Sequence, residues 1–157
     1  MNLEIEKITY RRVDLNNRDE MQFLAAIDMA IPAKFDPIFE VNEKTIAERL
    51  EQLMKCQADD FFDLALADNG KIVGYHFMNK YTSPHGDVNA SIQTLWVAPD
   101  FRKQGIATIL KKRGESWAKE HKLDAILTFV HHKNSAMVNL NKNLDYELVG
   151  YKFKKKL

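Results

Sequence analysis

Apolar and polar residues follow patterns that predict four strands and two helices in the first two thirds of the chain. Residues 3–13 alternate and favour an opening strand, and apolar residues recur at helical spacing after Asn16 and Asn17, which are good helix caps. A second helix is expected over 43–57. The two prolines of 31–39 predict a loop that is either wedged into the core or folded over a ligand.

The middle of the chain is typical of antiparallel strands. Two β-rich runs, 61–67 and 71–81, are joined at 68–70 by a turn whose Asn-Gly pair tolerates positive φ, a strong hairpin signal. Another turn at 83–87 leads into a strand over 89–97. These strands are expected to lie side by side in one sheet.

The last third of the chain alternates between helix and strand patterns. Helix, strand, helix and strand are expected in turn at 105–122, 125–130, 134–143 and 147–153. Such alternation implies a parallel pair of strands near the middle of a mixed sheet. Since 157 residues are about one domain's length, we predict a single α/β domain over 1–157, with about six to seven strands and about four helices.

Charge is divided unevenly along the chain. The composition, 45% hydrophobic and 29% charged, is that of a globular protein and excludes a disordered, collagen-like or membrane-bundle chain. The net charge of +1 hides two unlike halves: residues 1–78 carry 9 basic and 15 acidic side chains, and residues 79–157 carry 14 and 7. The basic half is therefore expected to handle an anion.

The single cysteine, Cys56, indicates the compartment. It excludes a disulfide within the chain and fits the reducing cytoplasm, and its amphipathic surroundings favour a packing role over a catalytic one. No signal peptide is recognised at the N-terminus, and no apolar run reaches the about 20 residues that span a bilayer. We expect a cytoplasmic protein that does not enter a membrane.

The stretch 95–107 runs from strand to turn to helix and has the features of an anion site. A helix that opens at Gly105 presents unpaired N–H groups and the positive end of its dipole. Gly105 and Ala107 leave space for a ligand, although tight strand–helix packing would also explain these small residues. Positive charge is added by Arg102, Lys103, Lys111 and Lys112. Together they predict a pyrophosphate cradle.

Other phosphate-binding motifs are missing from this stretch. A dinucleotide fingerprint needs three glycines in the strand–helix turn, and only Gly105 is present. The Gly-Lys-Ser/Thr sequence of nucleoside-triphosphatase loops is also missing. Dehydrogenase, kinase and GTPase functions are therefore excluded.

The string VAPDFRKQGIA resembles the acyl-CoA-binding motif of the GNAT superfamily of N-acyltransferases. The signature Arg/Gln-x-x-Gly-x-Gly/Ala matches Arg102, Gly105 and Ala107, preceded by the usual Val-x-Pro. The run 134–146 resembles the last helix of the superfamily. The resemblance covers nearly the whole chain, although 14–60 match only in the order of elements.

The resemblance implies a GNAT-like fold in which parallel strands, here 91–97 and 125–130, splay apart as a V and admit the pantetheine arm of acetyl-CoA, the co-substrate. The backbone near the end of the first strand would pair with the arm, and N–H groups of the cradle would hold the pyrophosphate. Asn134 would reach the pantetheine, cap the last helix, or both. The expected cofactor-binding residues are Leu95, Trp96, Val97, Arg102, Lys103, Gln104, Gly105, Ile106, Ala107, Thr108, Asn134 and Asn141.

The resemblance also identifies catalytic candidates, one of which departs from the family pattern. Many members carry a tyrosine, proposed to protonate the leaving thiolate, where this chain has Asn141. An asparagine cannot act as a general acid, but it can hydrogen-bond the coenzyme sulfur or an arm amide. The N–H of Val97 or Trp96 would donate to the oxyanion. Asp145, in place of the usual glycine, tolerates a left-handed backbone.

Four side chains are candidate general bases: His131, His76, Glu40 and Asp36. His131 stands at the end of the strand 125–130, where the splay would open, and histidine is suited to proton transfer near neutral pH. A surface or structural role for His131 remains the alternative. Gln93 and Thr94 could orient a bridging water.

A metal site and a nucleic-acid site are weaker interpretations. His131 and His132 would point to opposite faces of a strand and would not share an ion, so no metal is expected. The basic tail 152–156 could contact nucleic acid, but the alternation of Tyr151 and Phe153 with lysines is better explained by a last strand with one wet face.

The leading hypothesis is an N-acetyltransferase that moves the acetyl group of acetyl-CoA directly to a primary amine of a small molecule or peptide in a ternary complex. Acidic residues of the first half, such as Asp36, Glu40 and Glu43, could attract a cationic acceptor. The alternative is a catalytically silent CoA-binding sensor or partner module, and a nucleic-acid-binding protein is third. The expected partners are acetyl-CoA and the amine, with a second copy of the chain as a candidate.

Overall fold

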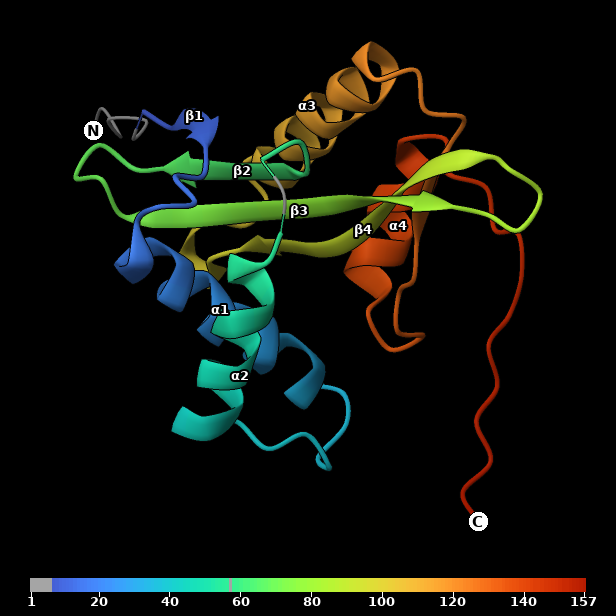
Figure 1. The fold of residues 1–157 in the computed structure, drawn as a ribbon, viewed down its shortest axis with the longest axis horizontal. Helices are drawn as coiled ribbons and strands as arrows, with labels where there is room; N and C mark the ends of the chain where they lie inside the picture. Colours follow the sequence, from blue (N-terminus) through green and yellow to red (C-terminus); the bar gives the residue numbers. More distant parts are fainter. Residues whose placement is uncertain (1–6, 57) are drawn as a thin grey trace.

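A five-stranded mixed sheet lies at the centre of the computed structural model, which describes residues 7–56 and 58–157 (Figure 1). The strand order is β1-β2-β3-β4-β5; the first four strands are antiparallel neighbours, and β5 is parallel to β4. The strands are β1 (Thr9–Arg12), β2 (Phe61–Leu66), β3 (Ile72–Thr82), β4 (Val88–Val97) and β5 (Ile126–Thr128). The helices are α1 (Arg18–Ala33), α2 (Glu43–Met54), α3 (Ile106–Glu120) and α4 (Ser135–Asn143), with a 3-10 turn, η1, at Pro99–Phe101.

Helices cover both faces of the sheet because alternate strand residues point to opposite sides. On β2, Phe62 and Leu64 pack into the core formed with α1 and α2. The next residue, Ala65, packs against α3 through Ile106 and Leu110. Figure 1 shows α3 on one side of the sheet, with α1 and α2 on the other. This arrangement confirms the α/β class and the expected four helices.

The prediction of six to seven strands is wrong for the part of the chain that the structure describes. The expected strand at 147–153 does not form, and this segment leaves the body as an extended chain (Figure 1). Alternation makes a segment suitable for a strand, but a strand also needs a partner, and the available edge strand, β5, is only three residues long. The tail instead contacts the body through Lys154, paired with Asp36 at 3.2 Å, and Lys152, above the Phe129 ring.

Element boundaries elsewhere agree closely with the predictions. The opening strand is shorter than 3–13, since β1 begins at Thr9, and its predicted residues 3–6 lie outside the described residues. Asn17 caps α1 as expected, accepting from the Glu20 N–H at 3.1 Å. The loop predicted at 31–39 begins later, because α1 continues through Pro32. Pro32 has no N–H to donate to the carbonyl oxygen of Asp28, four residues earlier, and α1 ends one residue later, at Ala33.

None of the described helices combines the length and the hydropathy needed to cross a bilayer.

Candidate functional site

The two parallel strands separate part of the way along β4. Their pairing covers three positions and ends where Ile92 lies opposite Thr128, whereas β4 continues beside β3 as far as Val97. Among the described residues, the second half of β4 therefore has a strand on one side only. This is the geometry expected of a splay between 91–97 and 125–130.

A β-bulge coincides with the end of this pairing. Phe77 lies opposite Thr94 and Met78 opposite Ile92, so that Gln93 has no opposite residue in β3. Bulges bend a strand and re-aim its side chains. A hollow of about 490 Å³ lies at this point, and it is lined by Ser91, Ile92, Gln93, Leu127, Thr128 and Phe129.

The backbone groups of β4 divide between β3 and the gap. The Ala98 N–H donates to the Val73 carbonyl oxygen at 2.9 Å, so Ala98 and, by alternation, Trp96 direct their backbone groups toward β3. Leu95 and Val97 then direct theirs toward the gap. Of the two oxyanion donors considered, Val97 therefore has the suitable orientation, and the Trp96 N–H does not.

The turn before α3 has the conformation that an anion cradle needs. Gly105 is the N-cap of α3 and has φ +82°, a left-handed conformation that favours glycine. The first helical hydrogen bond of α3 runs from the Ile109 N–H to the Gly105 carbonyl oxygen, at 3.0 Å. The N–H groups of the first turn, before Ile109, have no partner in their own helix. A Cβ added to Gly105 would meet no atom within 4 Å. The glycine is therefore required by the backbone conformation, and the tight-packing alternative does not explain it.

Cradle side chains differ in how much charge they offer to a ligand. Lys103 and Lys112 are exposed. Arg102 is exposed too, but its Nε donates to the Val97 carbonyl oxygen at 3.0 Å and ties the turn to β4. Lys111 was expected to add mobile charge to the cradle, but it is only 1% exposed and so does not reach the surface where a ligand would bind. The other predicted contacts, Gln104, Ile106, Ala107 and Thr108, belong to the turn and the start of α3.

Asn134 and Asn141 lie at the two ends of α4. The Asn134 side chain accepts from the Met137 N–H at 3.3 Å, so it caps the helix, the structural role considered for it. Asn141 is buried, and its Oδ1 accepts from the Nζ of Lys111 at 2.8 Å. This contact joins α4 to α3. Asp145, after α4, has φ +61°, the left-handed conformation expected of it.

His131 follows β5 and packs between two rings. It stacks on Phe35, with ring centroids 4.9 Å apart, and on His132, with centroids 4.7 Å apart. Its Nδ1 accepts from the Lys133 N–H at 3.2 Å, which leaves Nε2 as the protonated nitrogen. The expectation that the two histidines point to opposite faces is wrong, because β5 has ended before them. No group of three or more His, Cys, Asp or Glu side chains suited to a metal ion occurs in the described residues.

The other candidate bases lie in unfavourable places. His76 faces α3, where burial lowers its pKa to about 3 and its Nδ1 lies 3.1 Å from the Leu110 carbonyl oxygen. Asp36 is engaged with Lys154, and a backbone hydrogen bond from Ile38 holds the pKa of its carboxyl below the usual value. Glu40 is exposed on the loop after α1. Of the four candidates, His131 alone lies in the segment after β5, three residues past its end.

One buried carboxylate near the site was not among the sequence-based candidates. Asp28 of α1 accepts from Thr94 of β4 at 2.6 Å and from the Arg49 Nε of α2 at 2.8 Å. Burial raises the pKa of Asp28, and both partners oppose the shift. The sequence signal that could have identified Asp28 is an acidic residue among the apolar positions of an amphipathic helix. The cluster fixes Thr94 beside the bulge.

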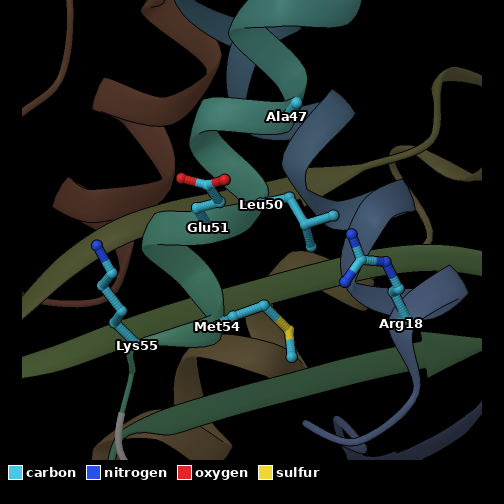
Figure 2. Close-up of a pocket in the computed structure, with 6 residues that line it drawn as sticks. All are labelled: Arg18, Ala47, Leu50, Glu51, Met54 and Lys55. Carbon is cyan, nitrogen blue, oxygen red and sulfur yellow. The ribbon is translucent and has the colours of Figure 1, made fainter.

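A second hollow lies away from these elements. It has a volume of about 370 Å³ and opens between the start of α1 and the outer face of α2 (Figure 2). Arg18 comes from α1, and the other residues drawn come from α2 and its end: Ala47, Leu50, Glu51, Met54 and Lys55. None of its lining belongs to β4, β5, α3 or α4, so we do not include it in the candidate site.

Comparisons with known proteins agree with this geometry. Three solved structures share the fold over almost their whole length. An acetyl transferase from Pyrococcus furiosus has a TM-score of 0.77 and 22% identity, covering 96% of this chain and 100% of that one. An aminoglycoside acetyltransferase from an uncultured soil metagenomic sample has a TM-score of 0.69 and 18% identity, with 95% and 97% covered. A transcriptional regulator from Bacillus halodurans has a TM-score of 0.70 and 16% identity, with 96% and 100% covered.

At these identities the structures establish the fold alone, and a search of curated proteins found no match. The model of the acetyltransferase (GNAT) family matches residues 27–146, which is most of the chain and includes β4, α3, β5 and α4. The chain therefore belongs to the acetyltransferase (GNAT) family.

Proposed function

We propose that the protein is an acetyl-CoA-dependent N-acetyltransferase that transfers the acetyl group directly to a primary amine in a ternary complex. The observation that supports this most is the separation of β4 from β5, together with the N-terminal end of α3, whose first N–H groups have no partner in their own helix. A single extended ligand could then pair with the gap side of β4 while its phosphates meet the N–H groups of α3. Cys56 is a free thiol, which fits action in the reducing cytoplasm.

Each protein group in the gap has a defined task under this proposal. The backbone of Leu95 and Val97 would hold the pantetheine arm, and the Val97 N–H would donate to the oxygen of the reacting carbonyl. Gly105, which leaves the cradle open, would let the first N–H groups of α3 approach the pyrophosphate. Acetyl-CoA itself supplies the activated acetyl group. His131 would accept the proton of the attacking amine at Nδ1, directly or through water, in place of the hydrogen bond from the Lys133 N–H.

Acetyl-CoA should stabilise the folded protein. Binding to the native state alone adds about 2.7 kcal/mol to the free energy of unfolding when the ligand is at about 100 times its Kd. We expect a rise in the Tm measured by differential scanning fluorimetry, and a smaller rise with ADP, which lacks the arm. An unchanged Tm at saturating acetyl-CoA would contradict the proposal.

A cationic amine is the acceptor class that we propose. The loop between α1 and α2 carries the exposed Glu40 beside Asp36, which is paired with Lys154, and Phe35 of the same loop stacks on His131, so the loop borders the proposed base. Release of free thiol from acetyl-CoA should be measured with polyamines, aminoglycosides, amino acids and peptides. Aminoglycosides are included because one protein of similar fold is described as acting on them.

Replacing His131 with alanine should lower kcat near neutral pH by at least about 100-fold if it is the base, since general base catalysis contributes about that much. His132→Ala is the matched control, because it removes the neighbouring exposed ring and leaves His131 in place. If both variants keep the wild-type kcat near neutral pH, His131 is not the base.

A catalytically silent CoA-binding module is the second candidate. The observation in its favour is Asn141, which stands where the resemblance to the family implies a tyrosine and which cannot donate a proton as a general acid. This alternative predicts the same rise in Tm with acetyl-CoA and no thiol release with any amine of the panel.

A further inference from the structure

Lys111 of α3 is a buried lysine with unusual partners. Its side chain is 1% exposed, and its Nζ donates to Asn141 Oδ1 at 2.8 Å and lies 3.8 Å from the centre of the Tyr146 ring. Buried lysines are rare and normally pair with a carboxylate. Here the direct partners are a neutral amide and an aromatic face. A costly cation is therefore held in place with little to neutralise it.

The charged groups around Lys111 come from the elements packed against it. Glu115, one turn further along α3, is a carboxylate that attracts the ammonium, and its Oε1 accepts from the Tyr146 hydroxyl at 3.5 Å. His76 of β3 is buried and neutral near pH 7. Burial lowers the pKa of Lys111 to about 8, so the ammonium form still predominates near neutral pH.

The sheet register places Lys111 level with the gap. His76 lies opposite Leu95 in the β3–β4 ladder, and its Nδ1 is 3.1 Å from the carbonyl oxygen of Leu110, the residue before Lys111. Leu95 lies beyond Ile92, where the pairing of β4 with β5 ends. The contact from Lys111 to Asn141 thus joins α3 to α4 at the level where β4 has lost its second neighbour.

We propose that the Lys111 ammonium, acting through the amide of Asn141, stabilises the coenzyme A thiolate as it leaves the acetyl group. The inference rests on the proposed function. With Asn141 Oδ1 accepting from Lys111, its Nδ2 hydrogens are free to donate to sulfur, and the nearby charge polarises the amide. Lys111 is thus a positioning residue, and Asn141 is the group that touches the coenzyme.

The step balances without a proton from Lys111. The amine nitrogen forms a bond to the acetyl carbon and gives its proton to the base, and the C–S bond then breaks with its electron pair going to sulfur. The resulting thiolate is held by Asn141 beside the ammonium and takes its proton from solvent on release. An amide in this position can replace a general acid, because a stabilised thiolate does not need immediate protonation.

The first test needs no acceptor and uses the thiol of bound coenzyme A. Its pKa, measured by ultraviolet difference titration of the thiolate, should be lower in the wild-type complex than in free coenzyme A. In Lys111→Met it should return to the free value or above. The control Lys119→Met removes an exposed lysine from the last turn of α3, away from the cradle, and should behave as wild type. Equal thiol pKa values in wild type and Lys111→Met would overturn the inference.

The second test separates a catalytic effect from a structural one. With an amine that turns over, Lys111→Met should lower kcat about tenfold with little change in the KM for acetyl-CoA, a smaller effect than the loss of a direct oxyanion donor. Wild-type kcat should fall as pH rises past about 8, where Lys111 loses its charge, and the fall should be missing in Lys111→Met. An unchanged kcat and pH profile in a variant that binds acetyl-CoA would refute this inference alone, whereas failure of the wild type to bind would refute the proposed function.

The Lys111→Met variant should fold. In the native state the pKa of Lys111 is lowered from 10.5 to about 8, so between these values the unfolded chain binds more protons. Wild-type stability should therefore rise as pH increases from about 8 to 10.5, because the buried charge is then discharged. The Tm of Lys111→Met should lack this rise and should exceed the wild-type Tm below pH 8. A lower Tm at every pH would contradict the burial of a charged Lys111.

Discussion

Gly105→Glu should abolish binding of acetyl-CoA while leaving the protein folded. Gly105 begins α3 in a left-handed conformation, where a side chain would project into open space in front of the first N–H groups of the helix. A glutamate there places its own carboxylate at the position of the pyrophosphate and repels it. The left-handed backbone adds about 1–2 kcal/mol of strain, which a stable domain tolerates. Isothermal titration calorimetry should detect no binding, and circular dichroism should show the native fold.

Two controls separate the charge from the strain. Gly105→Ala carries the same backbone cost without a carboxylate, so it should be destabilised and still bind acetyl-CoA. Gly86→Glu introduces the same residue at φ +93°, also in open space, in the turn at the other end of β4. Binding to Gly105→Glu as tight as to Gly86→Glu would show that the cradle is not at α3.

Arg113→Ala should destabilise the fold by about 3 kcal/mol. The Asp63 carboxylate is completely buried on β2, and Arg113 of α3 holds it through Nε and through Nη2, the latter at 3.1 Å. Removal of one partner leaves a buried charge without compensation, which costs about 3–5 kcal/mol. The lower value applies because 39% of the Arg113 side chain is exposed, so water partly replaces it. Urea unfolding should show the loss as a lower midpoint with the same slope.

The double variant Asp63→Leu with Arg113→Met tests the cause. It replaces both charges with apolar side chains of similar size, so it should recover most of the lost stability. Arg12, whose guanidinium is also influenced by Asp63, remains in both variants and does not account for a difference between them. If the double variant is as unstable as Arg113→Ala, packing of the arginine stem, and not the buried charge, determines the loss.

The sequence predicted the fold best where the causes are local. The asparagine cap of α1, the Asn-Gly turn between β2 and β3 and the left-handed Asp145 all formed as expected. Each depends on a few neighbouring residues and the preferences of their side chains. The strand predicted at 147–153 failed because its formation requires a partner that no local pattern reports.

The candidate site was predicted in part for the same reason. Gly105 and Asn134 stand where the pattern placed them, since the start of a helix is written in adjacent residues. Lys111 was expected to add mobile positive charge to the cradle, and the structure buries it against Asn141, 30 residues away. The stacking of His131 on Phe35 likewise joins segments that no local rule connects.

The sequence alone determined the family motif, the order of elements and the uneven charge, because these are properties of neighbouring residues. Only the tertiary structure decided where β4 parts from β5, which N–H of β4 faces the gap and which lysine is enclosed between α3 and α4. Those features depend on strand register and on contacts between distant segments. Register is set when whole faces of the sheet are buried together, so the pattern of a single segment does not determine it.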